Sequence, residues 1–361
     1  MNRPNFLWDK FKQNKIALLC LWVVVSLYLV AIFADFLSVY NYDNEERNFS
    51  FCPPTRINFV DGQGKFHLVP FVYGYSFSFN QYYQRVYKED KSQVFHLNLL
   101  ARGDGYKFLG LFKTDLHLLG LDSAGRLYLF GADSRGRDLY SRILYGARVS
   151  LSIGIIGVSV SFLIGLLIGG ISGYYGGRID NLIMRLCEMV MMIPGFYLML
   201  ALRAAFPTNL SSTQVFLLLI FILSFIGWAG MARVIRGISL SLKEREFVLA
   251  ARVLGISDLK IILRHILPHT LSYAIVALTL SIPGYILGES GLSFIGLGIQ
   301  DPQASWGNLL SDAMNISAIK FYPWILLPGV FIFITVMAFN LLGEGLRDAF
   351  DPRMKMVFKS S

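Results

Sequence analysis

The feature that most constrains this chain is a series of long apolar runs. A run of about 18 or more apolar residues is long enough to cross the hydrocarbon core of a bilayer as an α-helix. Charged residues make up only 16% of the chain and hydrophobic residues 54%, which is unusual for a soluble protein of 361 residues. We therefore predict an all-α, polytopic membrane protein. Its six transmembrane helices are expected around residues 16–34, 151–173, 182–206, 214–235, 271–298 and 321–342.

Basic residues in short loops predict the orientation, because Lys and Arg are retained on the cytoplasmic side. With the N-terminus inside, the cytoplasmic segments hold 15 Lys and Arg residues, whereas the short outer segments hold only Lys320. The inner segments are 1–15, 174–181, 236–269 and 344–361, and the outer ones are 207–213 and 299–322. This distribution also explains the net charge of +9 without nucleic-acid binding.

The start of the chain could be a signal peptide, because Arg3, Lys10, Lys12 and Lys15 precede the first apolar run. That run is longer than a usual signal core, and no Ala-x-Ala site closes it. We predict an uncleaved anchor.

Between the first and second spans lies an insert rich in aromatic residues. Alternating stretches at 65–75 and 106–112, with turn signals at 61–62 and 103–105, predict a small β-rich extracytoplasmic domain. Its histidines, His67, His96 and His117, have no ligand-like spacing, so we expect structural roles and no metal site. Cys20, Cys52 and Cys187 form no framework, and no disulfide is expected.

Residues 135–148 place apolar side chains at Leu139, Ile143, Leu144 and Ala147, with arginines opposite. This spacing predicts an amphipathic helix on the membrane surface. The expected order is therefore a cytoplasmic N-terminus (1–15), transmembrane helix 1 (16–39), the insert domain (40–134) and this interfacial helix (135–148). A membrane core follows (149–343), with helices 2–6 and the cytoplasmic loop 239–268, and the chain ends in a cytoplasmic C-terminus (344–361).

The second span carries a ridge of small residues spaced four apart, which are Gly157, Ser161, Gly165, Gly169 and Gly173. Small residues at this spacing allow another helix to approach closely. Two interpretations stay open: packing within the chain, and contact across a subunit interface or beside a transport pathway.

Two Pro-Gly pairs, which begin at Pro194 and Pro283, fall near the middle of the third and fifth spans and should bend them. Transporters often bind solute at broken helices, although kinks are also common in ordinary spans. Charges inside spans are costly, so the candidates also include Arg185, Glu188, Arg203 and Glu289. Arg185 and Glu188 are close enough to pair, whereas Glu289 has no obvious local partner and is a pathway or gate candidate.

The segment from Glu246 to Pro268, the 246–268 loop, reads as a helix, a glycine turn at Gly255 and a second helix. Ser257 or Asp258 can cap the second helix, and Pro268 is expected to end the motif. A short amphipathic projection of this kind suits docking of a soluble partner. The residues expected to form this docking element are Glu246, Ala250, Ala251, Arg252, Gly255, Ser257, Asp258 and Pro268.

The spacing of Ala250-Ala251, Gly255 and Leu267-Pro268 resembles the EAA loop of bacterial ABC importer permeases, although Leu249 replaces the usual Glu and His265 the usual Ile. Further motifs are similar to the second permease subunit of dipeptide and oligopeptide importers. These are Phe130–Leu151, Gly170-Ile-Ser-Gly-Tyr-Tyr-Gly-Gly, Leu292-Ser-Phe-Ile-Gly-Leu-Gly and Leu346-Arg-Asp-Ala-Phe-Asp-Pro-Arg. The resemblance covers residues 1–40 and about 130–361, and the long insert departs from it.

This resemblance implies the type I ABC importer permease fold in a bacterial inner membrane. It also implies a second homologous permease, two ATP-binding subunits and an extracytoplasmic solute-binding protein. The loop near Gly255 would enter a groove of one ATPase, and ATP with Mg²⁺ would be bound there. The chain itself has no Gly-x-x-x-x-Gly-Lys-Ser/Thr motif, so no catalytic residue and no cofactor are assigned to it.

Two other functions fit parts of the sequence. An intramembrane serine protease is suggested by Gly288-Glu-Ser-Gly291, but no histidine lies within a span to act as the base. A secondary transporter or channel that works without an ATPase is the alternative that remains.

Overall fold

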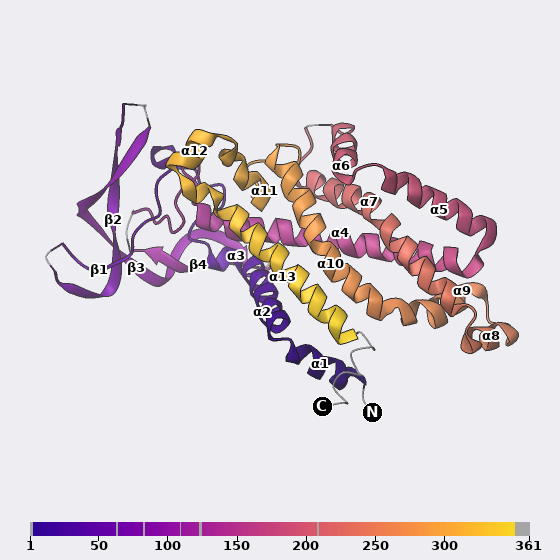
Figure 1. Ribbon diagram of the computed structural model, residues 1–361. Helices are drawn as coiled ribbons and strands as arrows, with labels where there is room; N and C mark the ends of the chain where they lie inside the picture. The colour runs from indigo at the N-terminus through magenta and orange to yellow at the C-terminus, as the bar shows by residue number, and fades with distance from the viewer. Residues whose placement is uncertain are drawn as a thin grey trace. The chain divides into compact units, whose positions relative to one another are not determined.

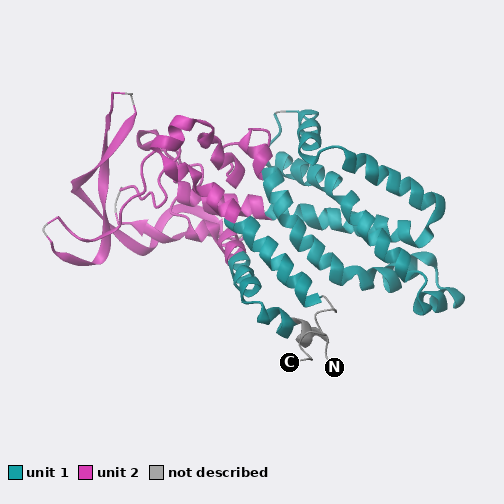
Figure 2. Ribbon diagram, in the orientation of Figure 1, with its two compact units in different colours: residues 1–25, 152–289, 334–361 teal, residues 26–151, 290–333 magenta. Residues whose placement is uncertain are grey.

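The computed structural model describes residues 3–62, 64–81, 84–108, 110–122, 125–207 and 209–350. The chain divides into two compact units (Figure 2). Unit 1 comprises residues 1–25, 152–289 and 334–361, and unit 2 comprises residues 26–151 and 290–333. Residues 351–361 of the expected C-terminal segment lie outside the described residues.

In the described part of the chain, five helical stretches are long and apolar enough to cross a membrane (Figure 1). They are α2 (Lys15–Ile32), α4 (Leu139–Tyr175), α7 (Ser212–Leu242), Asp258–Phe294, which includes α10 (Leu267–Phe294), and Pro323–Phe350, which includes α13 (Leu327–Phe350). A sixth candidate is the broken pair α5 (Gly177–Met192) and α6 (Gly195–Ala204), bent by 87°. The chain is mostly helical as predicted, and the six predicted transmembrane helices correspond to these five stretches together with the broken pair, if that pair is one span.

The sequence explains where several of these helices begin. The Asn14 side chain accepts a hydrogen bond from the Ala17 N–H at 3.0 Å at the start of α2. Ser211 and Gln214 form a reciprocal capping box at the start of α7. Between α5 and α6, Pro194 has no N–H to continue the helical hydrogen bonds, so the break falls at the Pro-Gly pair.

Two expected boundaries differ from the structure. The first span does not extend to residue 39, because α2 ends at Ile32 and is followed by the short helix α3 (Ala34–Leu37); α1 (Arg3–Gln13) precedes it. There is also no separate surface helix over 135–148, because residues 139–148 are the first turns of α4. The arginine face does not meet solvent throughout, since Arg142 is 1% exposed and bound within unit 2.

Unit 2 contains a four-stranded antiparallel sheet in the order β1-β2-β3-β4. The strands are β1 (Asn58–Val60), β2 (Phe66–Phe79), β3 (Arg85–Phe108) and β4 (Phe112–Leu121). Val72 and Leu97 pack with Val39 and Leu127 in a small core, so the sheet is attached to the segments on either side of it. The insert between α3 and α4 thus contains this sheet.

One predicted turn is wrong. Residues 103–105 lie within β3, and the register between β3 and β4 shifts between Arg102 and Tyr106, as in a bulge. Gly103 leaves room for the ring of His117, because a Cβ there would lie 2.8 Å from His117 Cδ2. Gly103 thus permits a bulge beside a buried side chain, and the local sequence signal could not distinguish this bulge from a turn.

The three histidines of the insert lie close to carboxylate or carbonyl oxygens, and the cysteines are buried. His67 and His96 lie 2.9 Å and 3.3 Å from the carboxylates of Asp61 and Asp122. His117 is 2% exposed, and its Nδ1 and Nε2 lie 2.7 Å and 2.9 Å from the carbonyl oxygens of Ser38 and Asp104. All three cysteines are free and buried.

Short elements complete the fold. They are η1 (Arg47–Phe49), α8 (Glu246–Val253), α9 (Asp258–Ile261), the π-helical segment η2 (Ile262–Ile266), α11 (Trp306–Leu309), η3 (Leu310–Met314), α12 (Ile316–Phe321) and η4 (Pro323–Leu326).

The start of α4 provides a pH prediction. Asp138 accepts a hydrogen bond from the Ser141 N–H at 2.8 Å, and burial raises the pKa of this carboxyl from 3.8 to about 7. Between these pH values the unfolded chain loses the proton while the folded chain keeps it, so the free energy of unfolding should fall as pH rises from about 4 to 7. The drop should be at most roughly 4 kcal/mol.

Asp138→Asn keeps an oxygen that can accept the Ser141 hydrogen bond but cannot titrate. We therefore expect the melting temperature of the variant, relative to that of the native chain, to be higher at pH 8 than at pH 5. Both melting temperatures are measured in detergent. A constant difference across this range would show that Asp138 is ionised throughout.

Candidate functional site

The small-residue ridge of α4 packs against α7. A Cβ added at Gly165 would lie 2.7 Å from Met231 Cβ, and one at Gly173 would lie 2.5 Å from Ser239 Cβ. Gly169 is equally close to the α7 backbone. The two helices thus approach to a distance that a side chain on α4 would prevent. Packing within the chain accounts for these three glycines.

The other two ridge residues belong to a hydroxyl cluster that joins three helices. Ser161 Oγ donates to the Ser224 carbonyl at 3.1 Å, and Ser224 Oγ donates to the Gly157 carbonyl at 3.1 Å. The Tyr285 hydroxyl of α10 shares a hydrogen bond with Ser161 Oγ. Polar groups at this depth are costly unless paired, so the cluster holds α4, α7 and α10 in register.

A cavity of about 480 Å³ lies beside this cluster in unit 1. No charged side chain is among the residues that line it in the described part of the chain. Serine and tyrosine hydroxyls supply its polar groups, and most of the remaining lining is aliphatic or aromatic, together with two methionines and three glycines. The lining includes Ser161, Met199, Gly227, Met231, Ser281 and Tyr285.

The three pathway candidates have different places. Pro194 lies at the break between α5 and α6, whereas α10 runs through Pro283 without a break. Glu289 is fully buried in α10. None of the three is among the described residues that line the cavity, although Gly284, next to Pro283, is.

The other three charged candidates within the predicted spans, Arg185, Glu188 and Arg203, have local partners. Arg185 Nη1 donates to Glu188 Oε2 at 2.8 Å, three residues along the same helix. Arg203 is 1% exposed and donates to the carbonyl oxygens of Phe206 and Pro207, just beyond the end of α6. Both arrangements are structural, and they add no group to the cavity.

The 246–268 loop forms two helical arms joined by a turn (Figure 1). Gly255 adopts a φ of +74°, which favours glycine, and ends α8. Ser257 is at the N-cap of α9, but its side chain makes no capping hydrogen bond. Pro268 does not end the motif, because the π-helical segment η2 leads directly into α10 and the helical stretch Asp258–Phe294 runs through Pro268.

The loop has a buried face and an exposed apolar tip. Val248 and Ala251 of the first arm and Ile261 and Ile262 of the second are at most 3% exposed, in a cluster that also contains Ile235 of α7. At the turn, the exposed apolar side chains are Val253 at 88%, Leu254 at 79% and Leu259 at 58%. Glu246, Ala250, Arg252, Ser257 and Asp258 are also exposed. Exposed apolar side chains on a firmly packed base are typical of an interaction surface.

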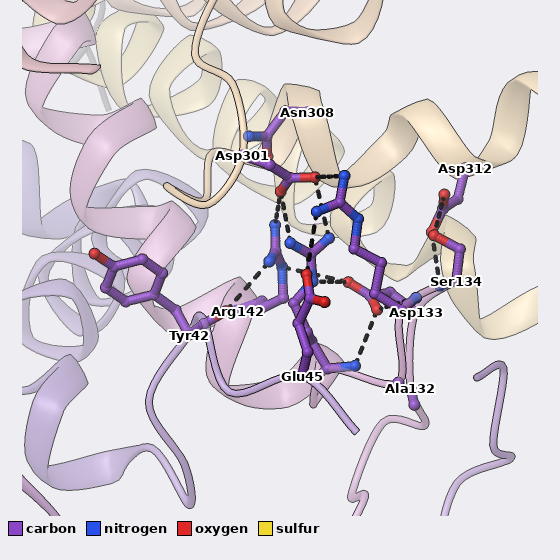
Figure 3. A network of polar contacts seen from close by, with 12 residues as sticks. Tyr42, Glu45, Ala132, Asp133, Ser134, Arg142, Asp301, Asn308 and Asp312 are labelled. Atoms are coloured by element: carbon purple, nitrogen blue, oxygen red, sulfur yellow. Dashed lines mark hydrogen bonds and ion pairs between the residues drawn. The ribbon is translucent and has the colours of Figure 1, made fainter. Parts of the chain in front are cut away.

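Unit 2 contains a buried ionic cluster that the sequence did not predict (Figure 3). Arg137 binds both oxygens of Asp301, at 2.8 and 3.3 Å, and its Nε lies 2.7 Å from Asp133. Arg142 Nη2 donates to the same Asp301 at 2.9 Å and its Nη1 to the Tyr42 carbonyl at 3.2 Å.

Burial and charge oppose each other at this cluster. The side chains of Arg137 and Arg142 are only 6% and 2% exposed. Burial would raise the pKa of Asp301, but the hydrogen bond from Arg137 and the charge of Arg142 outweigh it and hold that pKa below its ordinary value. Nearby, Ser134 donates to Asp312 through both its N–H and its hydroxyl (Figure 3). The cluster fixes the chain before α4 to the segment that follows α10.

Comparison with known proteins identifies the family. The family profile described as binding-protein-dependent transport system inner membrane component matches residues 165–356, more than half of the chain. The chain belongs to this family. A second profile, the N-terminal TM domain of oligopeptide transport permease C, matches residues 7–54 of this permease.

Named relatives support the same assignment. The permease is 45% identical to the oligopeptide transport system permease protein OppC of Haemophilus influenzae, over 63% of this chain and 70% of the relative. It is 41% identical to the dipeptide transport system permease protein DppC of Bacillus subtilis, over 63% and 69%. It is 43% identical to the OppC of Escherichia coli K12, over 63% and 72%. The permease is therefore a multi-pass membrane subunit of an ABC importer, and ATP hydrolysis belongs to a separate subunit.

Proposed function

We propose that this permease forms half of a translocation pathway for short peptides in a bacterial cytoplasmic membrane. The matched relatives are named for oligopeptide and dipeptide transport. The other half would be a second, homologous permease, with two ATP-binding subunits on the cytoplasmic side and a solute-binding protein outside. The permease binds no cofactor in this proposal, because ATP and Mg²⁺ are used by the ATPase subunits.

The orientation in this proposal follows the basic residues. Both termini and the 246–268 loop are cytoplasmic, and the sheet of unit 2 is extracytoplasmic. The uncharged cavity beside Tyr285 is part of the pathway. A largely apolar wall with a few hydroxyl groups and no charge suits peptides of varied side chains, and the hydroxyls can hydrogen-bond to the peptide backbone, which is the constant part of such a cargo.

The observation that carries the proposal is the exposed apolar tip of the 246–268 loop. Val253 and Leu254 stand at the turn, while the arms below them are packed into the core of unit 1. A firmly packed loop can transmit force, and covering its exposed apolar side chains with a partner lowers the free energy of the complex. The ATPase subunit is the partner that the family supplies.

Placing carboxylates at the tip tests this proposal. The double variant Val253→Asp, Leu254→Asp would bury two charges in the interface, so copurification of the ATPase with the tagged permease should fall at least tenfold. ATP-dependent uptake of a labelled tripeptide into proteoliposomes of the whole complex should fall with it.

Ile316→Asp is the matched control, because Ile316 is an apolar residue of α12 that is 82% exposed. This variant should retain the ATPase. Full copurification and uptake by the double variant would contradict docking at this loop. Peptide uptake by the permease reconstituted alone, without nucleotide, would instead support a secondary transporter or channel.

A further inference from the structure

Tyr174, at the C-terminal end of α4, lies between the two arms of the 246–268 loop. Its hydroxyl donates to Asp258 Oδ1, at the start of α9, at 2.5 Å. The guanidinium carbon of Arg252, in α8, lies 5.3 Å from the centre of the Tyr174 ring. One side chain therefore makes a directional contact with each arm, a charge-assisted hydrogen bond with α9 and a cation–π contact with α8.

The Tyr174 side chain also belongs to the core that supports the loop. It is 5% exposed and shares a cluster with Val248 and Ala251 of α8 and Ile261 and Ile262, at the end of α9 and the start of η2. The next residue, Tyr175, has the same chemistry but is 48% exposed. Position 174 is thus the one of this pair that is built into the base of the loop.

The end of α4 is also linked to α7 through Asp180 of α5. Ser172 Oγ donates to Asp180 Oδ1 at 2.6 Å, and Arg236 of α7 binds both oxygens of Asp180 at 2.8 and 2.5 Å. Together with the close approach of the Gly169 ridge to α7, this makes the α4–α7 pair a stiff unit. A displacement of the 246–268 loop can be transmitted to the α4–α7 pair through Tyr174, which contacts both arms of the loop.

We propose that Tyr174 is a positioning residue that transmits movement of the 246–268 loop to α4. The inference rests on the proposed docking function of the loop and adds the contact through which docking is coupled to the transmembrane helices. The hydroxyl makes the contact directional, because a hydrogen bond is lost when α9 slides, whereas apolar packing tolerates sliding.

Tyr174→Phe separates coupling from folding and from docking. The variant keeps the ring, its packing and the Arg252 contact, and it loses only the hydrogen bond to Asp258. In the complete complex, ATPase copurification should equal that of the native permease. The number of ATP molecules hydrolysed per tripeptide imported should rise about fivefold or more. Tyr175→Phe is the matched control and should leave that ratio unchanged.

Asp258→Ala removes the same hydrogen bond from its other end, at a position that is exposed to solvent. It should raise the ratio to a similar extent, and the double variant should add little to either single change, since both remove one interaction. An unchanged ratio in Tyr174→Phe, or fully additive effects, would overturn the inference. If the proposal that the ATPase docks at this loop were wrong, the Val253→Asp, Leu254→Asp variant would retain the ATPase, which is a separate measurement.

Discussion

Replacing Gly169 by alanine should destabilise the folded permease by about 2–3 kcal/mol, at the upper end of what overpacking usually costs. The added Cβ would lie 2.9 Å from Ile235 Cβ and 3.0 Å from Ala232 Cα, and closer still to the Ala232 carbonyl oxygen. Backbone atoms cannot rotate away as a side chain can, so α4 and α7 must separate along the ridge. The fraction of monodisperse protein that survives heating in detergent should fall at lower temperatures than for the native chain.

Gly237→Ala provides the matched control. Gly237 is also a helical glycine, in α7, but a Cβ there would meet no atom within 4 Å. Alanine should be neutral at that position or stabilise the helix by up to about 1 kcal/mol. Equal behaviour of the two variants would show that the helices do not approach as closely as the structure has them.

The second large effect is expected at Asp301. Asp301→Ala removes the carboxylate that both Arg137 and Arg142 bind and leaves two buried guanidinium groups with Asp133 as their remaining acid. Breaking a buried pair by removing one partner costs about 3–5 kcal/mol. We expect a low yield of folded protein and a clearly lowered melting temperature.

Glu45→Gln is the control for this change. Glu45 pairs with Arg47 and Arg135, whose side chains are 80% and 48% exposed, and exposed pairs contribute less than about 1 kcal/mol. If Asp301→Ala were as mild as Glu45→Gln, the buried cluster would contribute little to the stability of unit 2.

Much of the helical architecture could be predicted from local sequence. Apolar runs locate the spans because hydrophobicity and length alone decide whether a helix can cross a bilayer. Pro194 located the break between α5 and α6, since proline interrupts the hydrogen bonds of its own helix. The four-residue spacing from Gly157 to Gly173 placed these residues on one face, and the structure places α7 against Gly165, Gly169 and Gly173.

The remaining features depend on residues that are distant in the sequence. The arginines at 137 and 142 form part of a pattern that resembles a surface helix, and nothing local shows that Asp301 meets them. Residues 103–105 carry a turn signal, yet they lie in β3 at a bulge, where Gly103 leaves room for the ring of His117. The loop at 246–268 was recognised from its local pattern, whereas its contact with Tyr174 spans 84 residues and could not be.

The long separation within the ionic cluster also affects how the permease is made. Arg137 and Arg142 precede Asp301 by 164 and 159 residues. At a synthesis rate of about 5–20 residues per second, their shared partner emerges roughly 10–30 s after them. During that interval Asp133, which both arginines also contact, is already present in the chain. The ion pairs of Asp301 with Arg137 and Arg142 can therefore form only after α10 has been synthesised, although both arginines precede α4 or lie in its first turn.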